Sequence, residues 1–290
     1  MAEYVLFTDS CCDLTDALAK EMQLTVLPLS VHMDDETYQN LLDESEITYK
    51  DFYAKLPGVK DVKTSAVNQQ AFTDAMEPIL QSGRDLLYIG FSSGLSGTYS
   101  AGALAAQELA EKYPERKIYA VDSLCASLGQ GMYVYLAWQK KCAGATIEEV
   151  RDYLEEIKMN LCHWFTVNDL FHLKKGGRVS ATTAILGSML SIKPILHVDK
   201  DGHLINVGKA RGRKASLKAL VDKARELAIN PAEQTMFISH GGCADEAEYL
   251  AGMVRKELGV KDVVISYVGP VIGSHSGPGT MALFFLGTER

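Results

Sequence analysis

The sequence of 290 residues lacks several features that each indicate a class of protein. No stretch reaches the ~18 consecutive apolar residues of a membrane-spanning helix. The N-terminus, MAEYVLFTDS, lacks the basic and apolar segments of a signal peptide. We therefore expect a cytoplasmic protein without stable membrane insertion. No Gly-Lys-Ser/Thr phosphate loop occurs, so the chain is not expected to bind ATP by that motif.

The chain also lacks a positive net charge and lacks the cysteine spacings that are typical of metal sites. The net charge of −8 argues against a general nucleic-acid binder, because neutralising phosphates requires a basic face. The six cysteines show no Cys-x-x-Cys or Cys/His ligand spacing, so we expect reduced thiols and no metal site. The one basic stretch, KARGRK at 209–214, is either a docking patch for an acidic partner or a solvated helix start.

What the sequence does contain is an alternation of short apolar runs with helical patterns, which is typical of an α/β fold. We expect two domains, each a largely parallel sheet flanked by helices, over residues 1–165 and 166–268. The apolar run 281–286, within the tail 269–290, is expected to return to the first domain as a strand. Asp201-Gly202 predicts a hairpin. The expected strands are 4–8, 25–32, 85–91, 117–121, 163–167, 235–240 and 263–268, and the expected helices are 99–113, 146–160, 213–229 and 244–258.

The turn 92–98, SSGLSGT, follows a predicted strand and opens a predicted helix. Such a turn can bind an anion with its backbone N–H groups and with the hydroxyls of Ser93, Ser96 and Thr98. It does not match the Gly-x-Ser-x-Gly elbow of the α/β-hydrolases. Plain capping of the helix is the alternative reading.

Two further turns carry residues suited to a ligand. His275 lies between glycines in GSHSGPG, where it can bind a ligand or transfer a proton near neutral pH, unless it is an ordinary loop histidine. Arg178 ends the glycine turn 174–178, where its planar fork can pair with an anion, although a solvated turn is equally plausible.

These residues alone leave the class of function open. One reading is a serine hydrolase that uses a serine, His275 and an acid such as Asp9 or Asp122. Another is a protein that binds a small acid with hydroxyls, backbone N–H groups and a histidine. A regulatory or structural module with an empty pocket is a third class.

The order of the motifs adds a resemblance to a known family. The sequence resembles the DegV family, and specifically the fatty-acid-binding subunit of bacterial fatty acid kinase. The matching segments follow the family's order from residue 8 to residue 280. They are Thr8-Asp9-Ser10-x-x-Asp13-Leu14, Thr64-Ser65, the turn 92–99, Asp122-Ser123-x-x-x-Ser127-x-Gly129-x-Gly131, residues 173–180, Lys193-Pro194-Ile195, Val268-Gly269-Pro270 and His275-x-Gly277-Pro278-Gly279.

The resemblance implies a two-domain α/β fold with an acyl chain buried between or within the domains. It implies that Thr64 and Ser96 hold the fatty-acid carboxylate, with His275 nearby and with Ser93 and the N–H of Gly97 as further donors. Family members often continue Thr-Ser with Gln-Pro, whereas this chain has Ala66-Val67. The residues implied to contact the partner or to present the acid are Arg178, Arg211 and Arg213.

The resemblance also implies how the chemistry is divided between proteins. The chain would bind the fatty acid without catalysing a reaction and without a cofactor of its own. A separate kinase would supply ATP and magnesium and convert the bound carboxylate into an acyl phosphate. Contact with a membrane surface would then be transient.

Overall fold

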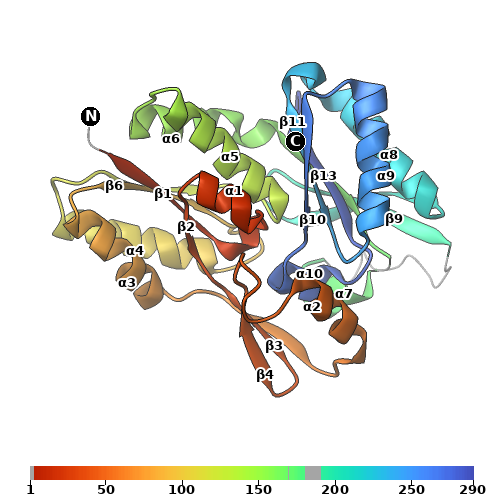
Figure 1. Ribbon diagram of the computed structural model, residues 1–290, viewed down its shortest axis with the longest axis horizontal. Helices are drawn as coiled ribbons and strands as arrows, with labels where there is room; N and C mark the ends of the chain where they lie inside the picture. Colours follow the sequence, from red (N-terminus) through yellow and green to blue (C-terminus); the bar gives the residue numbers. More distant parts are fainter. Residues whose placement is uncertain (1–2, 169, 180–190) are drawn as a thin grey trace.

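The computed structural model describes residues 3–168, 170–179 and 191–290. The N-terminal half is organised around a first sheet of four parallel strands in the order β2-β1-β6-β7 (Figure 1). Its two central strands are buried along their whole length because helices cover both faces. The strands are β1 (Tyr4–Asp9), β2 (Thr25–Leu27), β6 (Asp85–Gly90) and β7 (Ile118–Asp122).

The helices on the two faces of the first sheet take alternate side chains of its strands. Phe7 of β1 packs towards α3 and α4, whereas its neighbour Leu6 packs towards α5 and α6. Thr146 caps the N-terminus of helix α6: its hydroxyl accepts the N–H of Glu149, while the Glu149 carboxylate accepts the N–H of Thr146. This capping box stabilises the start of the expected helix 146–160. The helices are α1 (Asp16–Glu21), α3 (Gln69–Gln81), α4 (Thr98–Lys112), α5 (Leu128–Cys142) and α6 (Ile147–Ile157).

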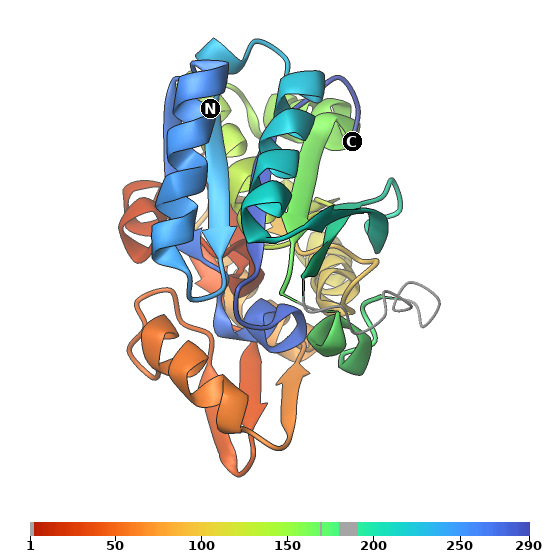
Figure 2. The ribbon, with the colours of Figure 1, turned by 90° about the vertical axis from the view of Figure 1, so that its right-hand side faces the viewer.

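A second sheet of six strands follows in the order β10-β9-β8-β13-β11-β12. Figure 2 shows α8 and α9 side by side over one of its faces. Only the pair β11–β12 is parallel, so the expectation of a largely parallel second sheet is wrong. The elements are β8 (Leu161–Thr166), β9 (Ile192–Val198), β10 (Leu204–Arg211), α8 (Arg213–Leu227), β11 (Thr235–His240), α9 (Ala244–Leu258), β12 (Asp262–Tyr267) and β13 (Met281–Leu286).

The antiparallel pairing of this sheet comes mainly from one hairpin and from the position of the last strand. The turn at Asp201-Gly202 joins β9 to β10 as a hairpin, as predicted, with Gly202 at a φ of +79°. The tail strand β13 inserts between β8 and β11 and runs antiparallel to both. The expectation that residues 281–286 return to the first domain is therefore wrong. Strand β8 already belongs to the second sheet, which thus begins at Leu161, ahead of the expected boundary at residue 165.

A small third sheet projects from the body of the molecule, with the order β4-β3-β5 and antiparallel pairing (Figure 1). Helix α10, which connects β12 to β13, contacts β3, β5 and α2, so part of the C-terminal tail does reach the N-terminal half. The elements are β3 (Ser30–Met33), β4 (Glu36–Gln39), α2 (Tyr49–Lys55), β5 (Val62–Ser65), α7 (Phe171–Lys175) and α10 (Pro270–Ser276). Short 3₁₀ helices are η1 (Ser10–Cys12), η2 (Leu56–Gly58), η3 (Lys158–Asn160) and η4 (Pro231–Glu233).

Helix α5 lies between the first and second sheets and joins their cores. It contacts β1 and β6 on one side and β8, β11 and β13 on the other. One hydrophobic cluster accordingly combines Leu6 of the first sheet, Met132 of α5 and Phe284 of the second. The layers from one side to the other are α3/α4, first sheet, α5/α6, second sheet and α8/α9 (Figures 1 and 2).

The structure also bears on two expectations from composition. All six cysteines are free, as predicted for reduced thiols. Within the described residues, no helix combines the length and the apolar character needed to cross a bilayer.

Candidate functional site

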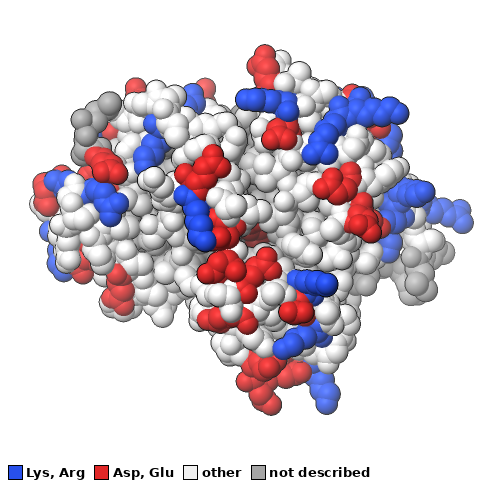
Figure 3. All heavy atoms as spheres, viewed as in Figure 1, with Lys and Arg blue, Asp and Glu red and all other residues white. Residues whose placement is uncertain are grey.

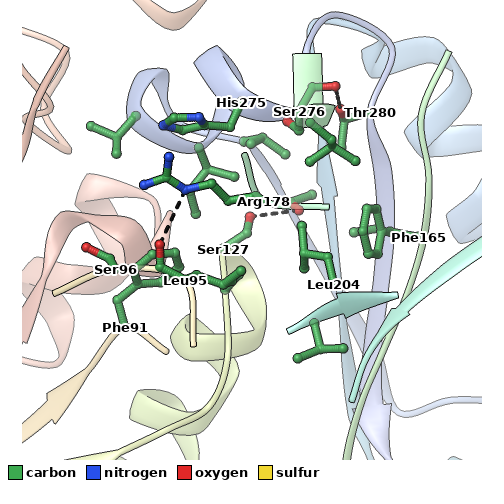
Figure 4. A pocket seen from close by; sticks show the side chains of 18 of the residues that line it. Phe91, Leu95, Ser96, Ser127, Phe165, Arg178, Leu204, His275, Ser276 and Thr280 are labelled. Carbon is green, nitrogen blue, oxygen red and sulfur yellow. Dashed lines mark hydrogen bonds between the residues drawn. The ribbon is translucent and has the colours of Figure 1, made fainter. Parts of the chain in front are cut away.

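A cavity of about 240 Å³ lies where the first sheet, the second sheet and helix α10 meet. Its wall is mainly apolar, and several of its polar side chains, among them Ser96, Arg178 and His275, come from turns and from the end of helix α10 (Figure 4). The apolar lining comes from both sheets and includes Leu29, Phe91, Leu95, Phe165, Leu173, Val198, Leu204, Val271, Ile272, Ala282 and Phe284. Such a cavity suits a ligand with a polar head and a hydrocarbon body.

The polar side of the cavity is built around Thr64 and His275. Although 211 residues apart in sequence, Thr64 Oγ1 and His275 Nε2 are hydrogen bonded at 2.8 Å. Thr64 belongs to β5 of the small sheet and His275 to the last turn of α10, so the contact of α10 with β5 brings them together. Thr64 and His275, two of the residues predicted for the carboxylate site, therefore meet in one cavity.

A glycine holds the imidazole of His275 in place. A Cβ atom at Gly176, after helix α7, would lie 2.2 Å from His275 Nδ1. Only a residue without a side chain lets the chain pass this close to the ring. Burial and the nearby cation of Arg178 lower the pKa of His275 to about 4. The ring is therefore neutral at pH 7 and can donate one hydrogen bond and accept another.

Arg178 brings a positive charge to the same place. Its half-buried side chain lines the cavity, with Nε donating to the carbonyl of Leu95 and Nη1 to that of Gly176 (Figure 4). In the part of the chain that the structure describes, no carboxylate pairs with it. Because a guanidinium has five N–H donors, this cation can still bind an anion with two parallel hydrogen bonds.

Only part of the serine turn 92–98 lies at the cavity. Ser96 and Gly97 line the cavity, and the Ser96 hydroxyl is hydrogen bonded to that of Thr98 at 2.9 Å. Ser93 is exposed and does not line the cavity; its N–H donates to Asp122. The structure thus brings Thr64, Ser96, Gly97, Arg178 and His275 together and leaves Ser93 outside.

Three serines that line the cavity, Ser127, Ser239 and Ser276, were not among the candidates from sequence. The hydroxyl of Ser276 is buried and has no partner among the described residues. Its position next to His275 was the signal that could have identified it. Ser127 has φ 55° and ψ −143°, a conformation that residues other than glycine rarely adopt and that is often found at functional sites. No sequence pattern reveals such strain.

Ser127 anchors a buried polar cluster beside the cavity. Its Oγ lies 2.5 Å from Asp13 Oδ2 and 2.9 Å from the hydroxyl of Ser239, which also lines the cavity. Burial raises the pKa of Asp13 to about 8, although the hydrogen bond from Ser127 opposes this shift. Asp13 is therefore mostly protonated at pH 7.

The acids considered for a hydrolase are engaged elsewhere. Asp9 is fully buried and accepts hydrogen bonds from the N–H groups of Phe91 and Cys11. Asp122 accepts those of Ser93 and Leu124. Since His275 is bonded to Thr64, the described residues form no serine–histidine–acid triad from the candidates named.

The basic stretch 209–214 is divided between two environments. Lys209 and Arg211 are exposed on β10, an edge strand of the second sheet, where charges also discourage pairing with other chains. Arg213 is mostly buried and pairs with Glu246 at 2.7 Å, so it is less accessible than Arg211. On the face of the molecule seen in Figure 3, Lys and Arg gather at the side of the second sheet, whereas acids gather over the central and lower parts. Ser180, the last residue of one matched motif, lies outside the described residues.

No metal centre accompanies the cavity in the described part of the chain: residues 3–168, 170–179 and 191–290 contain no group of three or more His, Cys, Asp or Glu side chains placed to hold an ion.

The fold and the cavity together define a class: α/β proteins with a largely apolar cavity, lined from both large sheets, that has a polar end. Comparison with known proteins identifies the family. The model of the DegV family, described as uncharacterised proteins, matches residues 4–288, and the chain belongs to this family.

Relatives of the chain match its sequence or its fold along almost its whole length. A DegV domain-containing protein of Clostridium perfringens is 48% identical, covering 100% of this chain and 99% of its own. The structure of a DegV family protein from Thermus thermophilus, described as binding fatty acid, is 31% identical with a TM-score of 0.87, covering 98% of this chain and 99% of its own. A fatty acid binding DegV family protein of Streptococcus agalactiae is 28% identical with a TM-score of 0.85, covering 100% of both chains.

Proposed function

We propose that this protein binds a long-chain fatty acid, with its carboxylate at Thr64, His275 and Arg178 and its acyl chain along the apolar wall. The observation that carries this proposal is the guanidinium of Arg178, which has no carboxylate partner among the described residues and lies at the polar end of an apolar cavity. Relatives described as binding fatty acid share the fold over nearly the whole chain, which supports it.

The free energy of binding would come mainly from the tail. Each buried methylene contributes about 0.8 kcal/mol, so a long acyl chain supplies ample affinity. The carboxylate is the costly group, because a buried charge without donors is heavily penalised. The cation of Arg178 and the hydroxyls of Thr64, Ser96 and Ser276 offset that cost.

The Thr64–His275 pair is suited to hold a carboxylate rather than to activate a nucleophile. When Nε2 of the neutral His275 carries its proton, it donates to Thr64 Oγ1. The hydroxyl hydrogen of Thr64 is then left for the ligand. A carboxylate bound there would also raise the pKa of His275 from its low value, since opposite charges favour the protonated ring.

Extraction of the purified protein with organic solvent tests the binding. We expect mass spectrometry to find fatty acid at close to one molecule per chain. The delipidated protein should take up fatty acid again and should not hydrolyse chromogenic acyl esters. Absence of lipid together with no uptake would refute the proposal, and ester turnover that is lost in Ser96→Ala would favour a hydrolase.

The second part of the proposal is that the chain presents the acid to a separate fatty acid kinase. The carboxylate would attack the γ-phosphorus of ATP bound to the kinase, giving acyl phosphate and ADP. The resemblance to the kinase subunit and the position of His275 beside the expected carboxylate support this role. With a cognate kinase, His275→Ala should impair phosphorylation more than it weakens binding of the tail.

Two surfaces complete the proposal. Lys209 and Arg211, exposed on β10, are the candidate patch for docking an acidic kinase surface. Phe171 is 63% exposed on α7 beside Lys174 and Lys175, an arrangement that suits transient contact with an anionic membrane from which the acid is taken up. Flotation with anionic vesicles, with Phe171→Ser as the comparison, tests that contact; equal flotation of both proteins would remove Phe171 from it.

A further inference from the structure

His163 of β8 is a polar residue in an apolar part of the cavity wall. It lines the cavity together with Phe165, Ala282 and Phe284, which lie on the same face of the second sheet. His163 is the register partner of Phe284, and the two rings meet edge to face with 5.5 Å between their centroids. The imidazole of His163 thus lies among apolar side chains that are suited to contact an acyl chain.

Among the residues that the structure describes, the ring of His163 has no hydrogen-bond partner. It is 2% exposed, and in the part of the chain that the structure describes neither of its nitrogens is paired. Burial and the charges of Arg290 and His197 hold the pKa of His163 well below its usual value, so the ring is neutral with one donor and one acceptor nitrogen. Buried polar groups are nearly always paired, and an unpaired one that lines a cavity points to a group on the ligand.

The fold makes room for this ring. A Cβ atom at Gly129 of α5 would lie 2.3 Å from both Cδ2 and Nε2 of His163. The ring is therefore packed between the bare backbone of α5 and the edge of Phe284. Because packing rather than hydrogen bonding sets its position, its hydrogen-bonding capacity is not consumed within the described protein.

His163 lies deep in the cavity relative to the carboxylate site. The polar residue Thr280, which lines the cavity, immediately precedes β13, which starts at Met281. Phe284, opposite His163, is three residues further along that strand, or about 10 Å at the usual rise per residue. An acyl chain with its head at Thr64 and His275 would therefore pass His163 with carbons well beyond the carboxyl group.

We propose that His163 forms a polar subsite that selects fatty acids carrying a hydroxyl or keto oxygen in the middle of the acyl chain. The subsite rests on the proposed function, fatty-acid binding, and adds to it the class of acid. A mid-chain keto or hydroxyl oxygen can accept the imidazole N–H, or a hydroxyl can instead donate to the ring nitrogen that carries no proton. A methylene at the same place leaves both nitrogens buried and unpaired, which lowers the affinity for a saturated chain.

The delipidated wild-type protein tests the selection directly. Its affinities for octadecanoic acid and for hydroxyoctadecanoic acids with the hydroxyl at successive mid-chain positions are measured by competition. We expect one positional isomer to bind at least as tightly as the saturated acid and about tenfold more tightly than isomers with a displaced hydroxyl. A saturated acid that binds more tightly than every isomer would overturn the subsite. Binding of neither kind of acid would instead refute the proposed function.

A pair of histidine variants separates the subsite from a general effect on the sheet. In His163→Leu, the affinity ratio of the preferred hydroxy acid to the saturated acid should fall about tenfold or more. His197→Leu is the matched control, because His197 does not line the cavity and stacks on Trp164, with 5.0 Å between the ring centroids. Equal ratios in wild type and His163→Leu would contradict the inference. Should that variant fail to fold, His163→Gln must retain part of the preference.

Discussion

Replacement of Thr64 by valine probes the polar end of the cavity with the smallest change in shape. Valine keeps the branched Cβ that suits strand β5 and removes only the hydroxyl that is bonded to His275 at 2.8 Å. The hydroxyl is half-buried, and the proposed ligand is a carboxylate. A hydrogen bond to a charged group contributes about 1.5–3 kcal/mol, so the dissociation constant for a fatty acid should rise about ten- to 150-fold.

The assay is isothermal titration of delipidated wild type and Thr64→Val with a fatty acid and with its methyl ester. The ester keeps the tail but carries no charge, so its affinity should differ much less between the two proteins. Thr37→Val is a matched control: Thr37 is an exposed threonine of the same small sheet, bonded to His32 at 2.9 Å away from the cavity. An equal loss for acid and ester, or an equal loss in Thr37→Val, would show that the effect is structural and refute the reasoning.

Three further outcomes are expected. Gly176→Ala should displace the His275 ring and weaken fatty-acid binding severalfold or more, measured by the same titration; unchanged affinity would remove the ring from the site. Asp13 keeps its proton in the folded state up to about pH 8, whereas in the unfolded chain it loses the proton near pH 4. The free energy of unfolding should therefore fall as the pH rises from about 4 to 8, by up to about 1.4 kcal/mol per pH unit relative to Asp13→Asn. The same pH dependence of the two proteins in urea denaturation would contradict this. Arg211→Glu should weaken binding of a cognate kinase without changing Tm, whereas Arg213→Glu should lower Tm because it breaks the pair with Glu246; the reverse pattern would move the docking patch.

The local elements could be predicted from the sequence because their signals are local. The expected strand 235–240 and helix 244–258 coincide with β11 and α9, and the expected strand 85–91 differs from β6 by one residue. The Asp201-Gly202 turn likewise determines its hairpin through the positive φ of glycine.

The pairing of the strands could not be predicted in the same way. The run MALFFL of β13 predicts a strand buried on both faces, and both sheets offer such a place. Its insertion between β8 and β11 depends on side chains brought together from across the chain. The expected strand 25–32 is divided in the structure between β2 and β3, and the small sheet was not predicted as a separate unit. Its strands have only four residues each, too few to show a clear alternation.

The residues of the site could likewise be predicted only where a local sequence pattern identified them. His275 and Arg178 could be singled out because each lies in a glycine-rich turn. Their meeting with Thr64 was implied only by the resemblance to the DegV family, since no local pattern relates residues that are 211 positions apart. Ser127 and His163 were missed because backbone strain and a lack of hydrogen-bond partners are properties of the folded chain.

The connection between β12 and β13 has a mechanical consequence. This connection leaves the second sheet, packs against the small sheet as α10 and then enters β13. The small sheet is therefore in contact with a segment whose two ends are both fixed in the second sheet. Any swing of the small sheet against the body would stretch or compress the contact between Thr64 and His275. A change in the distance between these two side chains would therefore report a shift of the small sheet, and the imidazole resonances of His275 in solution would measure it.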